Sequence, residues 1–187
     1  MLDRLTLPVT LHAAEALVLR RAGRDDLGAI MRLLSDDPVS AGRGDVGSAD
    51  DEPAYAAALD RILTDPGNDL LVAVRASGTA AGTAAGSGTA EVVGTFQLTL
   101  IPGMARRGST RLLVEAVRVS SAERSSGIGS ALMRWTTDVA APALGASLVQ
   151  LTSDAARVDA HRFYRRLGFV DSHVGFKFAV PSAPSPS

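Results

Sequence analysis

Apolar positions along the chain follow two different periods, and the switches between them predict its secondary structure. Alternating segments, or short apolar runs bounded by Gly or Pro, are typical of β-strands. Apolar residues three or four positions apart are typical of helices that bury one face. The predicted strands are 16–23, 68–76, 91–103, 112–120, 147–153 and 169–180. The predicted helices are 24–37, 54–67, 127–141 and 154–168.

The order of these elements predicts an α/β fold with a mixed, mostly antiparallel central sheet and helices on both faces. Three successive strands, from 68 to 120, should run antiparallel because no helix separates them. The helix at 127–141 can instead place the strands on either side of it in parallel. We expect one domain over 1–180 and a disordered tail over 181–187.

Two segments carry more detailed expectations. The Gly- and Ala-rich stretch 77–90 is predicted to be a flexible hairpin loop, because closely flanking strands argue against a domain linker. In the helix at 127–141, one apolar face should bury Ile128, Leu132, Trp135 and Val139. Pro142 and Gly145 should then end or kink that helix.

Composition narrows the class of protein. The chain has 187 residues, of which 46% are hydrophobic and 21% charged, a balance that is typical of a globular domain. The formal net charge of -1 provides no basic field for nucleic acid. The sequence contains no run of about 18 apolar residues, so we expect no membrane span. The N-terminus lacks the long apolar core of a secretory signal.

The chain contains no cysteine, which excludes disulfides, thiolate metal sites and a cysteine nucleophile. This is consistent with a reducing cytoplasm. Three histidines, His12, His161 and His173, lie far apart without ligand-like spacing, so we expect no metal. His161 and His173 are interpreted as surface or packing residues rather than catalysts.

One stretch, "VEAVRVSSAERSSGIGSALMRW" from Val114 to Trp135, joins a predicted strand to a predicted helix through a Ser- and Gly-rich turn. It lacks the third glycine of a dinucleotide loop and the Gly-Lys-Ser/Thr of a P-loop. What remains is Arg124-x-x-Gly127-x-Gly129 before a helix, where unpaired amides and the helix dipole favour an anion. The alternative, a plain turn with a solvated Arg124, stays open on these residues alone.

A second stretch favours the anion site over the plain turn. "DAHRFYRRLGF" follows about 35 residues later, and its Ala160–Phe169 matches A-x-x-F-Y-x-x-L-G-F. Together, in this order, the two stretches resemble the GNAT superfamily of N-acetyltransferases, in which an R/Q-x-x-G-x-G/A loop holds the pyrophosphate of coenzyme A. The resemblance covers nearly the whole domain, and "GTFQLTLIPGMARRGSTRLLVEAVRV" looks like a bacterial subgroup whose substrate is unassigned.

The resemblance implies acetyl-CoA as co-substrate and the following sites. Backbone groups of Val117, Arg118 and Val119 would pair with the pantetheine arm. Tyr164 would protonate the leaving thiolate, and Glu115 would accept a proton from the amine. The full set of implied coenzyme-binding residues is Val117, Arg118, Val119, Arg124, Ser125, Ser126, Gly127, Ile128, Gly129, Ser130, Arg157 and Tyr164.

Each assignment has a structural alternative. Tyr164 could be a packing residue beside Phe163. Glu115 shares strand parity with Leu113, Val117 and Val119, and a carboxylate on so apolar a face could instead form an ion pair with Arg111 or Arg118.

The chain also departs from the family pattern. Many relatives have Asn where this chain has Arg157, so that coenzyme contact is in doubt, although Arg157 could bind phosphate instead. Ser153, Asp154 or Asp159 could take over part of the role. The basic pair Arg106-Arg107 is interpreted as a solvated loop, or as a contact for the 3'-phosphate of coenzyme A or an acidic substrate.

The resemblance implies an N-acetyltransferase that moves an acetyl group to a primary amine of a small molecule, by direct transfer in a ternary complex, and it implies a homodimer. We also expect a cytoplasmic location. A non-catalytic acyl-CoA sensor with the same fold is the alternative, and a nucleic-acid-binding regulator is disfavoured by the charge. The acceptor pocket is expected between the first two helices and the loops 38–53 and 101–111.

Overall fold

The structure is a computed structural model that describes residues 1–13, 15–37, 42, 44, 47–75, 91–123 and 125–180. It forms two compact units, Met1–Leu151 and Thr152–Ser187, and each is described by itself. Several predicted features lie outside the described residues: Arg124, the 77–90 loop, most of the 38–46 stretch and the 181–187 tail. The single domain over 1–180 stays a prediction.

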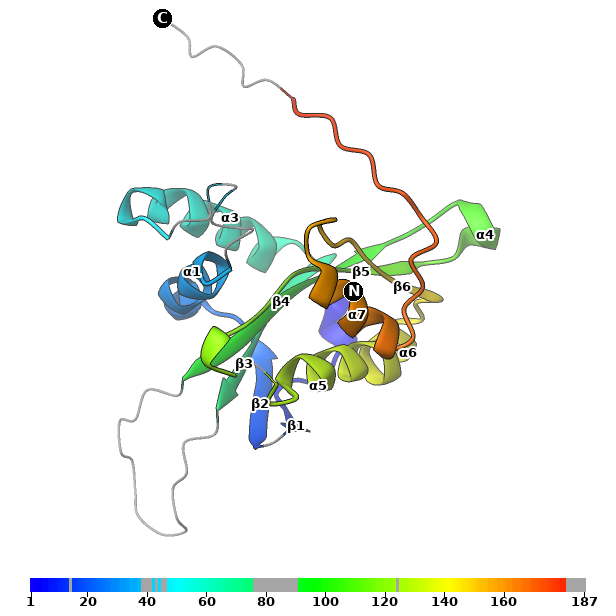
Figure 1. Cartoon of the computed structure of the whole chain (residues 1–187). Coiled ribbons are helices and arrows are strands. Elements are labelled where there is room, and N and C mark those ends of the chain that lie inside the picture. The colour runs from blue at the N-terminus through cyan, green and yellow to red at the C-terminus, as the bar shows by residue number, and fades with distance from the viewer. Residues whose placement is uncertain are drawn as a thin grey trace, which may run out of the picture. The chain divides into compact units, whose positions relative to one another are not determined.

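The first unit is built on a six-stranded sheet with the spatial order β1-β2-β3-β4-β5-β6 (Figure 1). All neighbouring strands run antiparallel except β5 and β6, which are parallel, so the predicted mixed, mostly antiparallel sheet is confirmed. The strands are β1 (Val9–His12), β2 (Ala16–Arg21), β3 (Asn68–Arg75), β4 (Val92–Ile101), β5 (Arg111–Val119) and β6 (Leu148–Leu151). Of these, β1 was missed because four residues are too short to show a period.

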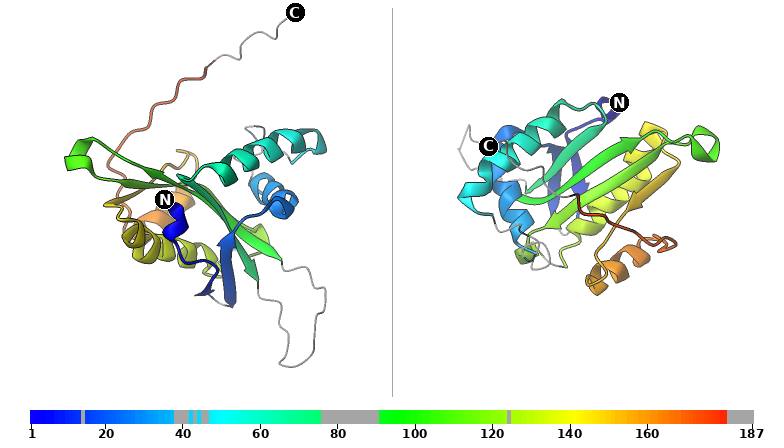
Figure 2. Two further views of the ribbon diagram at one scale, coloured as in Figure 1. Left: turned by 180° about the vertical axis from the view of Figure 1, so that it is seen from behind. Right: turned by 90° about the horizontal axis from the view of Figure 1, so that it is seen from above.

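Helices lie on both faces of this sheet, as predicted (Figure 2). One face carries α1 (Leu27–Ser35) and α3 (Glu52–Thr64), and the other carries α5 (Ile128–Trp135), which continues into η5 (Thr136–Ala140) and α6 (Ala141–Leu144). The short helical turns are η1 (Leu2–Arg4), η2 (Arg24–Asp26), η3 (Ala49–Asp51), α4 (Ala105–Gly108) and η4 (Ser121–Glu123). Within α4, Arg106 and Arg107 have positive φ and are exposed, so this segment is a turn within the predicted basic loop.

The helices on the first face are held by an apolar cluster and by a partly buried ion pair. Ile30 and Leu59 pack with Leu70, Val72 and Val74 of β3. At the start of α1, the Asp26 carboxylate accepts hydrogen bonds from Arg20 at 2.7 and 2.8 Å and from the Gly23 amide at 2.8 Å. The hydrogen bonds from Arg20 hold the pKa of Asp26 below its ordinary value, so this buried group stays charged.

On the opposite face, one prediction about α5 is wrong. Ile128, Leu132 and Trp135 are buried as expected, but Val139 is 53% exposed. The cause is η5, a π-helical turn, which places one extra residue in that turn of the helix and shifts the buried face by one position. Thr136 and Ala140 are therefore buried instead. Trp135 packs edge-on against Phe96 of β4, with ring centroids 6.4 Å apart.

The second unit contains α7 (Val158–Arg166) followed by the segment 169–180. The prediction of a final strand over 169–180 is wrong for this structure, because that segment has no regular secondary structure. Its apolar positions do alternate, yet Val170, Phe176 and Phe178 are 80%, 93% and 87% exposed. A strand needs a partner for its backbone N–H and C=O groups, and none of the described strands pairs with this segment.

Candidate active site

The two halves of β5 have different neighbours, and this difference builds the site. Residues Arg111–Val114 pair with β6, whose Leu151 is the last residue in the parallel register. Beyond Val114, β5 continues to Val119 with β4 along one edge but without β6 along the other. The sheet therefore opens at the point where the sequence placed Val117, Arg118 and Val119 against an extended ligand.

A β-bulge lies at the same point. Gln97 of β4 is opposite Glu115 and Thr95 is opposite Arg118, so Phe96 alone faces the two residues Ala116 and Val117. Ala116 has a φ of 50°, in the left-handed region that few non-Gly residues adopt. Bulges re-aim side chains and are common beside active sites.

The bulge corrects the predicted strand parity. Directly paired residues share a face of the sheet, so Glu115 lies with Leu113 on the face that carries α1 and α3. Val119 pairs with Gly94, whose missing Cβ would point at Leu132 of α5 on the opposite face. Glu115 and Val119 therefore lie on opposite faces, because the extra residue shifts the alternation by one position.

The structure does not contain the predicted ion pair of Glu115. This residue is exposed and makes no ion pair with any residue that the structure describes. Arg111 instead donates a hydrogen bond to Gln150 Oε1 at 3.3 Å, and Arg118 Nη1 donates to the Val117 carbonyl at 2.9 Å. The Glu115 carboxylate is thus open to a ligand on the face of α1 and α3.

A hollow of about 250 Å³ lies on this face of the sheet, at the end of α3. Its lining residues are Ala58, Arg61, Ile62, Asp65, Asn68 and Gln97. Gln97, the residue opposite Glu115, donates to Asn68 Oδ1 at 2.9 Å. Asp65 accepts from the Gly67 amide at 2.7 Å and from Asn68 Nδ2 at 2.9 Å, whereas Arg61 pairs with none of the described residues.

Two described residues between β5 and α5 have left-handed backbone conformations. Ser125 and Gly127 have φ values of 67° and 85°, and Gly127 caps α5 without a side-chain hydrogen bond. The first amides of a helix have no partner within the helix and carry the positive end of its dipole. The start of α5 therefore has the backbone geometry that an anion site requires, and the role of Ser125–Ser130 in binding the coenzyme stays a prediction.

Sequence reasoning missed one residue that holds this loop. Arg75, at the end of β3, donates a hydrogen bond through Nη2 to Glu123 Oε1 and another through Nη1 to Glu91 Oε2 at 3.2 Å. Its Nε lies 3.4 Å from Glu15 Oε2. These carboxylates are 16 to 60 residues away in the chain, so only knowledge of which strand ends meet would have identified the cluster.

In the second unit, Tyr164 lies at the end of α7. Gly168, with a φ of 89°, ends the helix: its amide donates to the Arg165 carbonyl at 3.0 Å, and the Phe169 amide donates to the Tyr164 carbonyl at 3.1 Å. This is a Schellman cap, which is typically accompanied by a contact between the two residues that its longer hydrogen bond joins. Here Tyr164 packs edge-on against Phe169 with ring centroids 5.8 Å apart.

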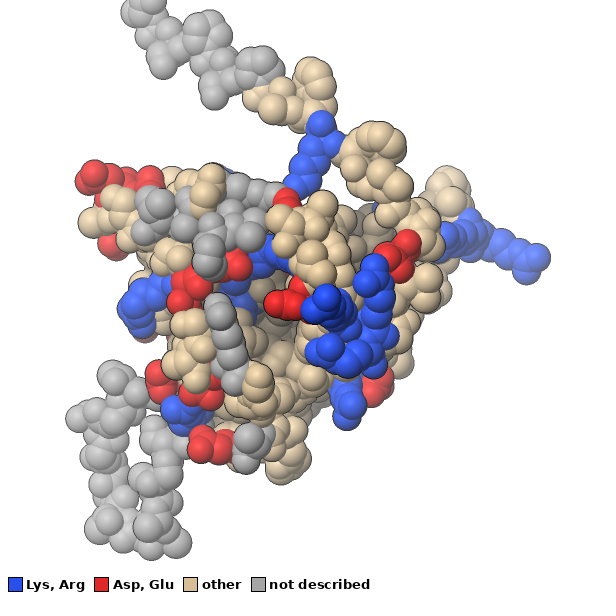
Figure 3. Space-filling model, in the orientation of Figure 1, with Lys and Arg blue, Asp and Glu red and all other residues tan. Residues whose placement is uncertain are grey.

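Three other residues of the second unit that the sequence analysis discussed have local hydrogen-bond partners. Arg157 precedes α7, and its amide donates to the Asp154 carbonyl at 3.0 Å. The Nε2 of His161 lies 2.8 Å from the same carbonyl, and Nδ1 of His173 lies 2.8 Å from the Ser172 hydroxyl. Basic side chains gather around α7 (Figure 3). The helix and its N-cap residue contribute Arg157, Arg162, Arg165 and Arg166 to the sequence there.

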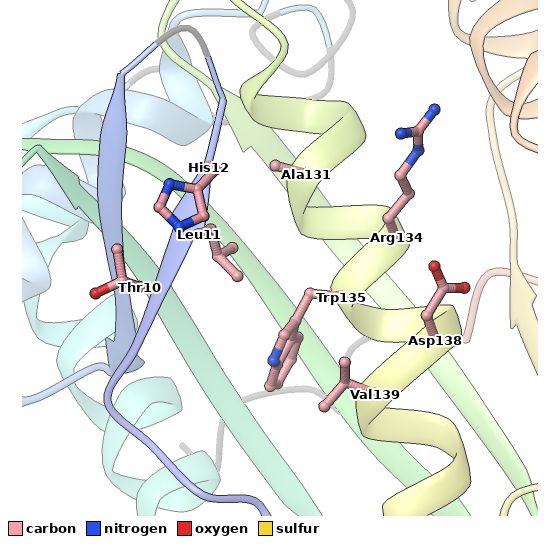
Figure 4. A pocket seen from close by; sticks show the side chains of 8 residues that line it. All are labelled: Thr10, Leu11, His12, Ala131, Arg134, Trp135, Asp138 and Val139. Atoms are coloured by element: carbon pink, nitrogen blue, oxygen red, sulfur yellow. The ribbon is translucent and has the colours of Figure 1, made fainter.

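A second hollow in the first unit, of about 270 Å³, contains none of the predicted site residues. It lies between β1 and the α5–η5 helix, with Thr10, Leu11 and His12 on one side and Trp135 on the other (Figure 4). Arg134 and Asp138 lie at its rim. This hollow has a mostly apolar lining, whereas the hollow beside Gln97 is lined mostly by polar residues.

Comparison with known proteins defines the class. Residues 29–169 match the model of the Acetyltransferase (GNAT) family, and the chain belongs to this family. An aminoalkylphosphonate N-acetyltransferase of Salmonella typhimurium is 44% identical over 57 residues, which are 30% of this chain and 36% of that protein. The chain thus matches little more than a third of that curated relative's length.

Two solved structures share the fold. A transcriptional regulator from Bacillus halodurans C-125 superimposes with a TM-score of 0.73 at 35% identity, over 88% of this chain and 99% of that one. A putative acetyltransferase from Agrobacterium tumefaciens gives a TM-score of 0.65 at 25% identity, over 87% and 99% of the two chains.

The first unit brings Glu115, Val117, Arg118, Val119 and Ser125–Ser130 together on one strand–loop–helix segment. Tyr164 and Arg157 belong to the second unit, so their roles stay predictions. Among the described residues, no group of three or more His, Cys, Asp or Glu could hold a metal ion. No described helix is long and apolar enough to cross a membrane.

Proposed function

We propose that this chain is an acetyl-CoA-dependent N-acetyltransferase that moves an acetyl group to the primary amine of a small molecule, by direct transfer in a ternary complex. The observation that carries the proposal is the opening of the sheet beyond Val114, followed by a helix whose N-cap residue, Gly127, makes no side-chain hydrogen bond. An extended ligand with an anionic end fits a strand edge that leads into a helix N-terminus.

Coenzyme A has that form. Its pantetheine arm would pair with the backbone of Val117, Arg118 and Val119. Its pyrophosphate would accept hydrogen bonds from the amides of the Ser125–Ser130 segment other than that of Ser126, which donates to the Glu123 carbonyl. The left-handed Gly127 supports this role, because it turns the chain into the helix without a side chain above the amides. Arg157 and Arg124 would add charge to the phosphates.

The amine would enter from the face of α1 and α3, where Glu115 is exposed. Acyl transfer needs a neutral amine, so Glu115 would accept a proton directly or through water. The amine nitrogen then bonds to the carbonyl carbon, the carbon–sulfur bond breaks, and the thiolate takes a proton from Tyr164. The extra proton on the new amide nitrogen returns, through water, to the Tyr164 phenolate. The phenol's ordinary pKa of about 10 makes it a suitable donor to a thiolate.

The relative from Salmonella is named for aminoalkylphosphonates, which join an amine to an anionic group. The hollow beside Gln97 supports the same kind of acceptor here, because Arg61 offers a cation there while the Asp65 carboxylate is occupied by two hydrogen bonds. We therefore propose small amines, including those with an anionic group, as acceptors.

A non-catalytic acyl-CoA sensor is the second candidate, and the Bacillus halodurans neighbour named as a transcriptional regulator favours testing it. Thermal shift with coenzyme A comes first: stabilisation should grow with ligand concentration. No shift at millimolar coenzyme would overturn both candidates.

An amine panel with free-thiol detection then separates enzyme from sensor. Ethylamine, 2-aminoethylphosphonate and β-alanine cover neutral and anionic acceptors. Thiol release that depends on amine and is lost in Glu115→Gln supports the enzyme, whereas binding without release supports the sensor. A homodimer and a cytoplasmic location remain part of the proposal, and light scattering on the purified chain tests the first.

A further inference from the structure

The Arg75 cluster links four separate segments at one end of the sheet. Arg75 ends β3, Glu91 precedes β4, Glu15 precedes β2, and Glu123 belongs to η4 before α5. The guanidinium contacts all three carboxylates: it donates to Glu123 and Glu91, and its Nε lies 3.4 Å from Glu15. Arg75 and Glu123 are the more protected partners, with side chains 33% and 21% exposed.

Glu123 in turn holds the loop that precedes α5. Its carbonyl accepts hydrogen bonds from the Ser126 amide at 3.2 Å and from the Ser126 hydroxyl at 2.6 Å. Its own amide donates to the Ser120 carbonyl at 2.9 Å, and the Ser120 amide donates to Val93 of β4 at 2.9 Å. Fixing the Glu123 side chain therefore fixes the backbone that leads into the first turn of the helix.

Charge gives Arg75 a second effect. The cluster has three carboxylates and one guanidinium, so two negative charges are in excess beside a loop suited to an anion. The hydrogen bond to Glu123 raises the pKa of Arg75 further above its ordinary value, so the guanidinium stays protonated. Without the Arg75 guanidinium, the three carboxylates would repel an approaching phosphate.

We propose that Arg75 is a positioning residue of the coenzyme loop: through Glu123 it holds the backbone at Ser120 and Ser126, and it offsets the carboxylates that would otherwise repel the pyrophosphate. It touches no substrate atom. The inference rests on the proposed function, since it assumes that the Ser125–Ser130 backbone receives the coenzyme.

The test is Arg75→Gln. We expect the Kd for coenzyme A and the KM for acetyl-CoA to rise about tenfold, a change of about 1.4 kcal/mol. The kcat at saturating acetyl-CoA and the KM for the amine should stay within about twofold, because the residue acts only on the coenzyme loop. Arg75→Lys should recover part of the affinity, because it keeps the charge but loses the planar fork.

Two further variants identify the mechanism. Arg75→Gln combined with Glu123→Gln should bind coenzyme better than Arg75→Gln alone, since it removes the unpaired carboxylate nearest the loop. The loss in Arg75→Gln should also shrink at high salt, where repulsion is screened. Arg24→Gln is the matched control: it breaks an exposed pair with Asp60 at 2.7 Å and should leave coenzyme affinity unchanged.

A readout without ligand keeps this proposal separate from the proposed function. Hydrogen exchange at the amides of Ser120–Ser126 should be about tenfold faster in Arg75→Gln than in wild type or Arg24→Gln. If wild type binds no coenzyme, the proposed function fails while this exchange result still decides whether Arg75 orders the loop. Unchanged coenzyme affinity in Arg75→Gln, or unchanged exchange in the turn, overturns the inference.

Discussion

Two stretches of the sequence match the pattern of the family: the strand–loop–helix Val114–Trp135 and the helix end Ala160–Phe169. They differ in the contacts that their residues make in the structure. In the first, groups remain open: β5 leaves β6, Gly127 has no capping side chain, and Glu115 makes no ion pair with a described residue. In the second, the features are satisfied locally: Gly168 completes a Schellman cap and Tyr164 packs on Phe169.

This difference shows that motifs with the same kinds of residue can form either an open backbone surface or the C-terminal end of a helix. Both stretches contain a left-handed glycine, yet Gly127 begins a helix and Gly168 ends one. The first three amides after Gly127 have no partner within the helix, whereas the amides of Gly168 and Phe169 donate to carbonyls of α7. The variants below compare the two stretches directly.

The largest effect is expected at Glu115 in the first stretch. Glu115→Gln should lower kcat/KM for the amine about 100-fold, the lower end of the range for a general base. The melting temperature should stay within about one degree, because an exposed residue without an ion pair adds little to stability. A steady-state assay that finds full activity would show that another group accepts the amine proton.

Tyr164 tests whether the second stretch also has a chemical role. Tyr164→Phe keeps the ring that packs on Phe163 and Phe169, so we expect stability to change little and kcat to fall about tenfold or more. Tyr164→Leu is the companion variant, which also loses the ring packing and should lower stability by about 1 kcal/mol. An equal kcat in wild type and Tyr164→Phe would make the helix end purely structural.

The sequence could predict the elements of the first stretch because strand period, loop glycines and helix period follow one another directly. It could not predict the bulge at Ala116–Val117, since nothing local distinguishes a strand with one extra residue. That bulge moved Glu115 to the face opposite Val119, and the π-turn at Thr136–Ala140 similarly moved Val139 out of the core. Both errors are one-residue shifts of phase.

Contacts between residues that are distant in the chain are the second kind of feature that the sequence could not predict. The alternation of 112–120 and of 169–180 is equally clear, but the first segment has strands on both sides and the second has none among the described strands. The Arg75–Glu123 pair likewise depends on which strand ends meet. The local preference for strand or helix could therefore be predicted from the sequence, whereas the pairing of distant segments could not.

The two left-handed glycines allow one substitution to be compared in both stretches. A Cβ at Gly168 would meet nothing within 4 Å, and one at Gly127 would meet only the Ala13 Cβ at 4.0 Å. Alanine should therefore cost about 1–2 kcal/mol of conformational strain at each site. Gly127→Ala should also weaken coenzyme binding several-fold, as the strained turn re-aims the helix amides.

Gly168→Ala should lower the protection of α7 against hydrogen exchange by a similar free energy and leave coenzyme affinity unchanged. Calorimetric titration and hydrogen exchange separate the two outcomes. Equal losses of affinity in both variants would mean that the helix end contributes to the coenzyme site as much as the loop does.

The smallest effect is expected at Ala116, the one non-Gly residue of β5 with positive φ. Ala116→Gly removes the side-chain strain of the left-handed conformation but gives the unfolded chain more freedom, so the two effects partly cancel. We expect a gain of at most about 1 kcal/mol in the free energy of unfolding, with the KM for acetyl-CoA unchanged if the bulge keeps its shape. A raised KM at equal or higher stability would show that the strain itself holds the opened half of β5 in position for the pantetheine arm.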